Sequence, residues 1–222
     1  MRKLFVALML GTAFLPAMAD PAVRGWKTYD ALGCMLLREC TDGTVKITTM
    51  DQLAEIYPYS NFEPVKDELN EMLTYLTELD IEVFISDEKY FPPGHRGTYH
   101  TVSNNFFLNK DYMDDPYTLL EVMRHEGWHA AQDCMAGSLD NNNIAIIRMP
   151  DTIPRGYHLA TEIAYAHQPG AIPWETEAKW AGSTADVTNE ALAACTTGAP
   201  WEVLEPTPKT REWLTREGYI KQ

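Results

Sequence analysis

Residues 115–137 carry the sequence DPYTLLEVMRHEGWHAAQDCMAG, which predicts one long helix with defined ends. Asp115 is a favourable residue just before a helix, because its side chain can accept a hydrogen bond from a free backbone N–H. Pro116 fits the first helical position, where the N–H that proline lacks would have no partner. We therefore expect the helix to run to Cys134 or Met135, before the glycine that follows.

Two histidines in this helix, His125 and His129, are four residues apart and so lie on one face, one turn from each other. Both can present an imidazole nitrogen to one metal ion, and histidine nitrogen is a common ligand of zinc. Glu126 lies next to the first histidine, where it would approach a metal-bound water and act as general base. The pattern predicts one zinc ion per chain, with Glu126 as the catalytic residue.

The chain before this helix contains both helical and strand patterns. Apolar residues recur at helical spacing over residues 50–57 and 63–79, with acidic residues on the opposite faces. Residues 81–86 alternate as a strand does, and residues 98–109 are rich in Thr, Tyr, Val and Phe. These patterns predict helices followed by a small sheet.

After the histidine helix we expect an irregular segment and then a second helix from Pro173 toward Cys195. The order of helices, small sheet, histidine helix, irregular segment and last helix predicts an α+β fold. No internal repeat or long linker divides the chain, and about 200 residues are enough for one hydrophobic core. We therefore expect a single domain after a cleaved leader.

Residues 1–19 have the pattern of a secretory signal peptide. Arg2 and Lys3 precede an apolar run, and small residues precede the expected cleavage after Ala19. The run is shorter than the ~20 residues that span a bilayer, so we expect no stable membrane insertion after cleavage. The formal net charge of −14 argues against nucleic acid as a partner. We expect a secreted or periplasmic protein, with its oligomeric state left open.

The four cysteines form an even set, as expected of disulfides in an exported chain. Proximity in the sequence favours a bridge between Cys34 and Cys40, which leaves Cys134 to pair with Cys195. No close Cys-x-x-Cys pair is present, which argues against a zinc site made of cysteines.

Two histidines do not complete a catalytic zinc site, which usually has three protein ligands. The metzincin pattern would continue with glycine and histidine where this chain has Gln132 and Met135, which excludes that class. Further along, Glu175 precedes Ala178 by three residues, as in the Glu-x-x-Ala-Asp element of gluzincin peptidases. The chain thus resembles the HExxH zinc metallopeptidases of the gluzincin type, including compact neutral zinc metallopeptidases, over residues 98–190.

The resemblance implies a zincin-like single domain, in which a small sheet packs on the histidine helix and a second helix bears the third ligand. It implies His125, His129 and Glu175 as zinc ligands and Glu126 as general base. Glu177 is an alternative ligand, but it lies two residues from Glu175, so the two cannot both face the ion on a helix. Weaker alternatives for the third ligand are Glu162, His158 and His167.

Lys179 stands where the family has an aspartate that usually orients a ligating histidine. Asp133 and Asp186 are alternatives for that role. Gln132 lies seven residues beyond His125 on the same helix face, either as a hydrogen-bonding group near the site or as an ordinary core or surface residue. Four residues between the ligand segments are candidates for a donor that would stabilise an oxyanion: Tyr157, His158, Tyr165 and His167.

Together with the resemblance, these residues predict a zinc metallopeptidase domain at 20–222, with an N-terminal helical part at 20–97 and a zinc-site part at 98–222. Its expected partner is a peptide or protein substrate. Two alternatives stay open: an exported zinc-binding protein of zincin-like fold without catalysis, and an amidase that acts on cell-wall peptides. A retained Glu126 favours an enzyme, because a pure binding site has no use for a general base.

Overall fold

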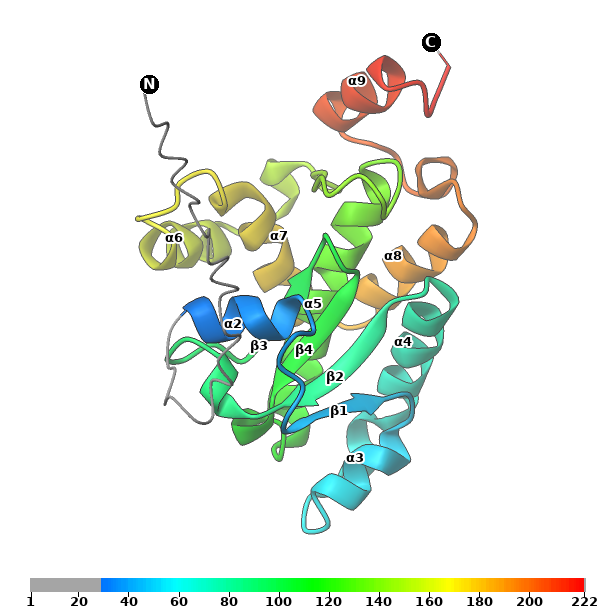
Figure 1. Ribbon diagram of the computed structural model, residues 1–222. Coiled ribbons are helices and arrows are strands. Elements are labelled where there is room, and N and C mark those ends of the chain that lie inside the picture. The colour runs from blue at the N-terminus through cyan, green and yellow to red at the C-terminus, as the bar shows by residue number, and fades with distance from the viewer. Residues whose placement is uncertain (1–28, 222) are drawn as a thin grey trace, which may run out of the picture.

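The computed structural model describes residues 29–221 and shows a mixed α+β domain with a small central sheet (Figure 1). The expected signal peptide lies outside the described residues. The strands are β1 (Thr44–Ile47), β2 (Glu82–Ser86), β3 (Gly97–His100) and β4 (Asn105–Asn109). They have the order β1-β2-β4-β3, in which the central pair runs parallel and each outer strand is antiparallel to its neighbour. The strands predicted at 81–86 and 98–109 are confirmed, the second as the hairpin of β3 and β4.

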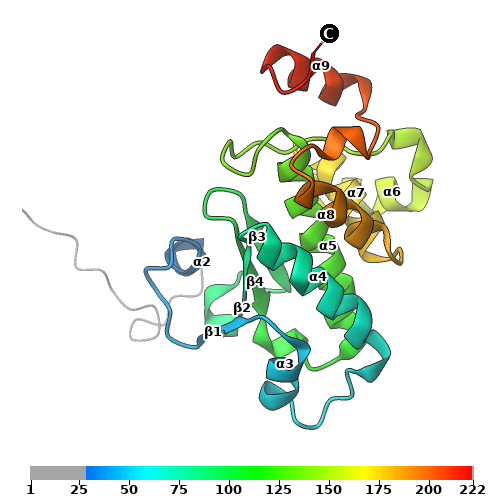
Figure 2. The ribbon, with the colours of Figure 1, turned by 90° about the vertical axis from the view of Figure 1, so that its right-hand side faces the viewer.

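The two central strands contribute to a separate core on each face of the sheet, because successive residues of a strand point to opposite faces. Phe84 and Phe107 stack on one face, with ring centroids 5.3 Å apart, and helix α2 (Tyr29–Leu36) packs there. The other face meets the larger core, which includes residues of α4 (Lys66–Glu78) and α5 (Pro116–Met135). Figure 2 shows α2 on one side of the sheet and these two helices on the other.

The start of the histidine helix is confirmed. Asp115 Oδ1 accepts a hydrogen bond from the backbone N–H of Thr118 at 2.7 Å, and Pro116 is the first helical residue. The helices predicted at 50–57 and 63–79 are also present, as α3 (Met50–Ile56) and as a short 3-10 turn that leads into α4. The remaining helices of the described chain are α6 (Arg155–Ala164), α7 (Ile172–Gly182), α8 (Val187–Thr196) and α9 (Pro208–Arg216).

The prediction of one helix from Pro173 toward Cys195 is wrong, because the chain turns between α7 and α8. Asp186 adopts a left-handed conformation with φ of 66° directly before α8, which breaks the helical path. The segment expected to be irregular also contains helix α6. The histidine helix α5 therefore packs against two separate helices, α7 and α8.

Both predicted disulfides, Cys34–Cys40 and Cys134–Cys195, are present. The second bridge joins the end of α5 to α8, the helix after the one that carries Glu175. Disulfides of this kind persist in oxidising compartments, which is consistent with an exported protein. Within residues 29–221, no helix has both the length and the apolar composition that a membrane span requires.

Candidate metal site

Helix α5 presents His125 and His129 on one face, with ring centroids 4.9 Å apart. The side chain of His125 is 25% exposed and that of His129 is 10% exposed, so the pair lies at the boundary between core and solvent. The neighbouring side of this turn is buried: Trp128 packs edge-on against Trp180 of α7. This packing fixes the rotation of α5 about its axis and so directs both imidazoles to the same open side.

Glu175, on helix α7, brings a carboxylate to these imidazoles. Its Oε2 lies 3.5 Å from Nε2 of His125 and 3.7 Å from Nε2 of His129. Oε2 is buried and makes no hydrogen bond with any described residue. One ligand atom from each of the three side chains lies within 4.8 Å of the other two, so the group could hold a metal ion.

The close approach of α7 to α5 depends on Gly182. A Cβ at this position would lie 3.0 Å from the backbone oxygen of Glu121 and 3.4 Å from Cβ of His125. Any larger residue would push α7 away from the turn that carries the first histidine. The glycine therefore helps to place Glu175 within reach of the histidines.

The electrostatics of this group favour a positive charge between the three side chains. Burial alone would raise the pKa of Glu175, but its contacts with His125 and His129 outweigh burial and hold that pKa well below the usual range. For His129 burial has the opposite sign and lowers the pKa, but the carboxylates of Glu175 and Glu126 more than reverse this effect. Each shift reflects attraction between carboxylate and cation in a poorly solvated place.

Glu126 is held against the sheet and does not belong to the three-residue group. Its Oε2 accepts a hydrogen bond from the backbone N–H of Tyr99 in β3 at 2.8 Å. Only 7% of the residue is exposed, yet it lines the same pocket as His125. In the described part of the chain Oε1 receives no hydrogen bond, which leaves this oxygen available to a water molecule in the pocket.

A chain of hydrogen bonds runs behind His129. Its Nδ1 lies 2.8 Å from Oε1 of Gln132, whose Nε2 donates to Oε2 of Glu177 at 2.7 Å and to the carbonyl of Trp174 at 3.2 Å. An amide oxygen only accepts, so Nδ1 of His129 carries a proton, and Nε2 is the nitrogen that could bind a metal ion in place of a proton. Gln132 thus takes the orienting role for which the sequence offered Asp133 and Asp186.

Glu177 points away from the histidines into the core. Besides the amide of Gln132, its carboxylate accepts hydrogen bonds from Nε1 of Trp128 at 3.2 Å and from the backbone N–H groups of Ile147 and Arg148. Burial raises its pKa, and these donors oppose that effect. Glu175 and Glu177 therefore face different surroundings, as their two-residue spacing predicts, and Glu175 is the one beside the histidines.

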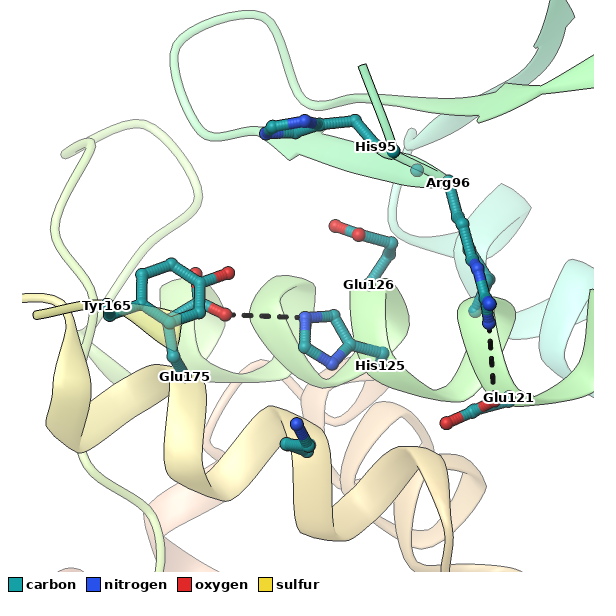
Figure 3. Close-up of a pocket in the computed structure, with 11 residues that line it drawn as sticks. His95, Arg96, Glu121, His125, Glu126, Tyr165 and Glu175 are labelled. Carbon is teal, nitrogen blue, oxygen red and sulfur yellow. Dashed lines mark ion pairs between the residues drawn. The ribbon is translucent and has the colours of Figure 1, made fainter. Parts of the chain in front are cut away.

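Two members of this group, His125 and Glu175, line a pocket of about 370 Å³ between the β3 edge of the sheet and α7. Figure 3 shows His125 and Glu126 in the middle, with Tyr165 and Glu175 at one end and Arg96 and Glu121 at the other. Burial, together with the carboxylates of Glu175 and Glu126, raises the pKa of Tyr165, which keeps its phenol protonated near neutral pH. The lining residues are Gly94, His95, Arg96, Gly97, Glu121, Val122, His125, Glu126, Tyr165, Glu175 and Lys179.

Most of the other residues singled out in the sequence lie outside the site or have partners outside it. Within residues 29–221, Asp133 and Asp186 make no hydrogen bond or ion pair with either histidine; Asp133 instead accepts from the hydroxyl of Tyr99. His158 contacts the carbonyl oxygen of Pro150. Of the four proposed oxyanion donors, Tyr165 alone lines the pocket.

In comparisons with protein-family models, with curated proteins and with solved structures, nothing matches this chain.

Proposed function

We propose that this protein is a zinc-dependent peptidase, in which His125, His129 and Glu175 bind one zinc ion and Glu126 is the general base. One observation carries the proposal: two imidazole nitrogens and a buried carboxylate oxygen without a hydrogen bond converge at one side of a pocket. A buried carboxylate oxygen that accepts no hydrogen bond is costly unless a cation compensates its charge, and a metal ion held with the two imidazoles would do so. Glu126 stands beside this group without being part of it, as a general base should.

The donor set suits zinc. Two histidines and one glutamate are the protein ligands of a common type of catalytic zinc site, whose fourth position stays open. With ligands at 2.0–2.1 Å and tetrahedral angles, neighbouring ligand atoms lie about 3.3 Å apart. Oε2 of Glu175 is 3.5 Å and 3.7 Å from the two imidazole nitrogens, so only small side-chain movements are needed.

Each residue around the site has a distinct role in the proposed hydrolysis. Bound zinc would supply a Lewis acid that makes water acidic and polarises the peptide carbonyl. Glu126 takes the proton of the attacking water on Oε1, while the N–H of Tyr99 holds Oε2. The same carboxyl then delivers the proton to the leaving amine. Tyr165, at the end of the pocket beside Glu175, is placed to donate its phenolic hydrogen to the carbonyl oxygen as charge develops there.

We also propose that residues 1–19 direct export and are removed, so that the mature enzyme acts outside the cytoplasm. The two disulfides support this part of the proposal, because such bridges are rare in a reducing compartment.

The test compares metal content and hydrolysis of a mixed peptide library for the wild-type protein and for Glu126→Gln. We expect about one zinc per chain in both proteins, and a loss of hydrolysis by at least about a hundredfold in the variant. Glu162→Gln is the control, since it makes the same chemical change at an exposed carboxylate of α6. Loss of zinc from Glu126→Gln, or undiminished hydrolysis, would contradict the assigned role. Zinc binding without hydrolysis of any peptide in the wild type would favour the non-catalytic zinc protein.

A further inference from the structure

We propose that the pocket selects substrates that carry a carboxylate close to the scissile bond, and that Arg96 and Lys179 recognise this carboxylate. This inference deepens the proposed function and rests on it for the position of the scissile bond. It starts from the two cationic side chains that line the pocket in a protein whose formal net charge is −14.

Lys179 lies on the pocket side of α7. It follows Glu175 by four residues, so the two side chains leave the helix on the same face, one turn apart. The residue is exposed, and its ammonium group makes no ion pair or hydrogen bond with any residue in the described part of the chain. Glu175, the carboxylate one turn before it on the same face of the helix, is directed to the two histidines. Lys179 is therefore a cation free to bind a ligand.

Arg96 enters the pocket from the opposite side, directly before strand β3. Its guanidinium lies 5.7 Å from the ring centre of Tyr112, and one of its nitrogens lies 3.8 Å from Oε2 of Glu121 (Figure 3). That distance is long for an ion pair, and both side chains are about half exposed. A guanidinium has five N–H donors, so most of those of Arg96 remain available to a planar carboxylate.

The two cations thus flank His125 and Glu126, one from the sheet side and one from the α7 side. With a divalent ion bound, the positive charges of the pocket outnumber its three carboxylates. Attraction of an anionic substrate is a short-range effect here, because the charges of the remaining surface are screened beyond about 8–10 Å. A C-terminal carboxylate or an acidic side chain near the scissile bond would both satisfy this chemistry.

Binding is measured in the Glu126→Gln protein with one equivalent of zinc chloride, so that hydrolysis does not interfere. The probes are an acetylated alanine tripeptide with a free C-terminal carboxylate, its C-terminal amide, and amidated tripeptides with glutamate or glutamine in the middle. We expect at least one acid peptide to bind about five- to tenfold more tightly than its neutral counterpart. The free-acid pair reports recognition of a C-terminus, and the glutamate pair reports recognition of a side chain.

The same titrations are repeated after adding Arg96→Gln, Lys179→Gln or Lys209→Gln. Lys209 is the matched control, because it is an exposed lysine on α9 outside the pocket. We expect the first two variants each to reduce the preference for acid peptides by more than half, and Lys209→Gln to leave it unchanged. Equal binding of acid and neutral peptides would overturn the inference, and so would a preference that persists in both pocket variants, since the metal alone would then explain it.

Hydrolysis by the protein with Glu126 intact separates the two proposals. If peptides are cleaved without regard to a nearby carboxylate, the inference fails and the peptidase function stands. If acid peptides bind through Arg96 and Lys179 but none is cleaved, carboxylate recognition stands and the peptidase function fails.

Discussion

Replacing Gln132 with methionine would remove every hydrogen bond of one fully buried side chain while nearly preserving its size. The substitution leaves Nδ1–H of His129 without its acceptor and removes one of the donors to Glu177. Nothing would then fix the imidazole tautomer that presents Nε2 to the metal. We therefore expect Gln132→Met to weaken zinc binding although no ligand has been changed.

The size of the effect follows from these contacts. A hydrogen bond to a charged group such as the carboxylate of Glu177 contributes about 1.5–3 kcal/mol, and a buried donor left without a partner costs about 1–3 kcal/mol. Glu177 keeps three other donors, and methionine adds apolar contacts, so we expect a loss of about 2–4 kcal/mol in the free energy of unfolding. Loss of a group that orients a metal ligand typically weakens metal affinity about 10- to 100-fold.

Two measurements separate these effects. Urea unfolding in the presence of a chelator gives the stability of the metal-free protein, and competition with a chromophoric chelator gives its zinc affinity. For zinc affinity, the control is Asp133→Asn, a polar change at the neighbouring buried position of α5, where the side chain faces Tyr99 and not the histidines. Unchanged zinc affinity in Gln132→Met, alongside the expected loss of stability, would refute the orienting role and leave Gln132 as a structural residue.

Three further predictions concern the surroundings of the site. Glu175→Ala should abolish tight zinc binding with little loss of stability, whereas Glu177→Ala should mainly destabilise the fold; a larger loss of zinc affinity in the second variant would reverse the ligand assignment. Replacing Cys134 and Cys195 with serine should cost about 4 kcal/mol by the chain-entropy model for a separation of 61 residues, measured by urea unfolding, and should also weaken zinc binding; unchanged values would make the bridge dispensable. Burial raises the pKa of Asp133 to about 7, so the folded protein retains a proton that the unfolded chain loses near pH 4, and stability falls as the pH rises from about 4 to 7. Asp133→Asn should remove this fall, with a gain of at most about 4 kcal/mol at pH 8 and little change at pH 4 in urea unfolding; equal pH profiles for the two proteins would contradict it.

The sequence predicted the elements that depend on local chemistry. The cap of Asp115, the proline that follows and the four-residue spacing of the histidines all act within one helix, so they can be recognised without knowledge of the fold. The break between α7 and α8 also has a local signal, the glycine, serine and threonine at positions 182–184, which the prediction of one helix from Pro173 toward Cys195 does not take into account. Left-handed geometry at Asp186 confirms the break.

The arrangement behind the site could not be predicted in this way, because it depends on contacts between distant segments. The amide of Gln132 is held in place because α7 brings Glu177 against it, and Glu177 lies 45 residues further along the chain. In the sequence Glu177 resembles any acidic residue of an amphipathic helix. Two of its four donors, Trp128 and Gln132, belong to α5, and the other two are the backbone N–H groups of Ile147 and Arg148.

The sheet contributes to the candidate site although it carries none of the proposed metal ligands. A histidine helix alone does not determine where its glutamate points, and here the backbone N–H of Tyr99 in edge strand β3 determines it. The strand can approach this closely because residue 97 is glycine: a Cβ there would lie 2.7 Å from Cγ1 of Val122 and 3.1 Å from Cγ of Glu126. Tyr99 also donates its hydroxyl hydrogen to Asp133, two turns further along α5 from Glu126, so one residue links the strand to the helix both within the His125–His129 turn and beyond it. The position of Glu126, the proposed general base, is thus a property of the strand–helix contact, and a larger residue at position 97 would alter the proposed chemistry without changing a proposed ligand.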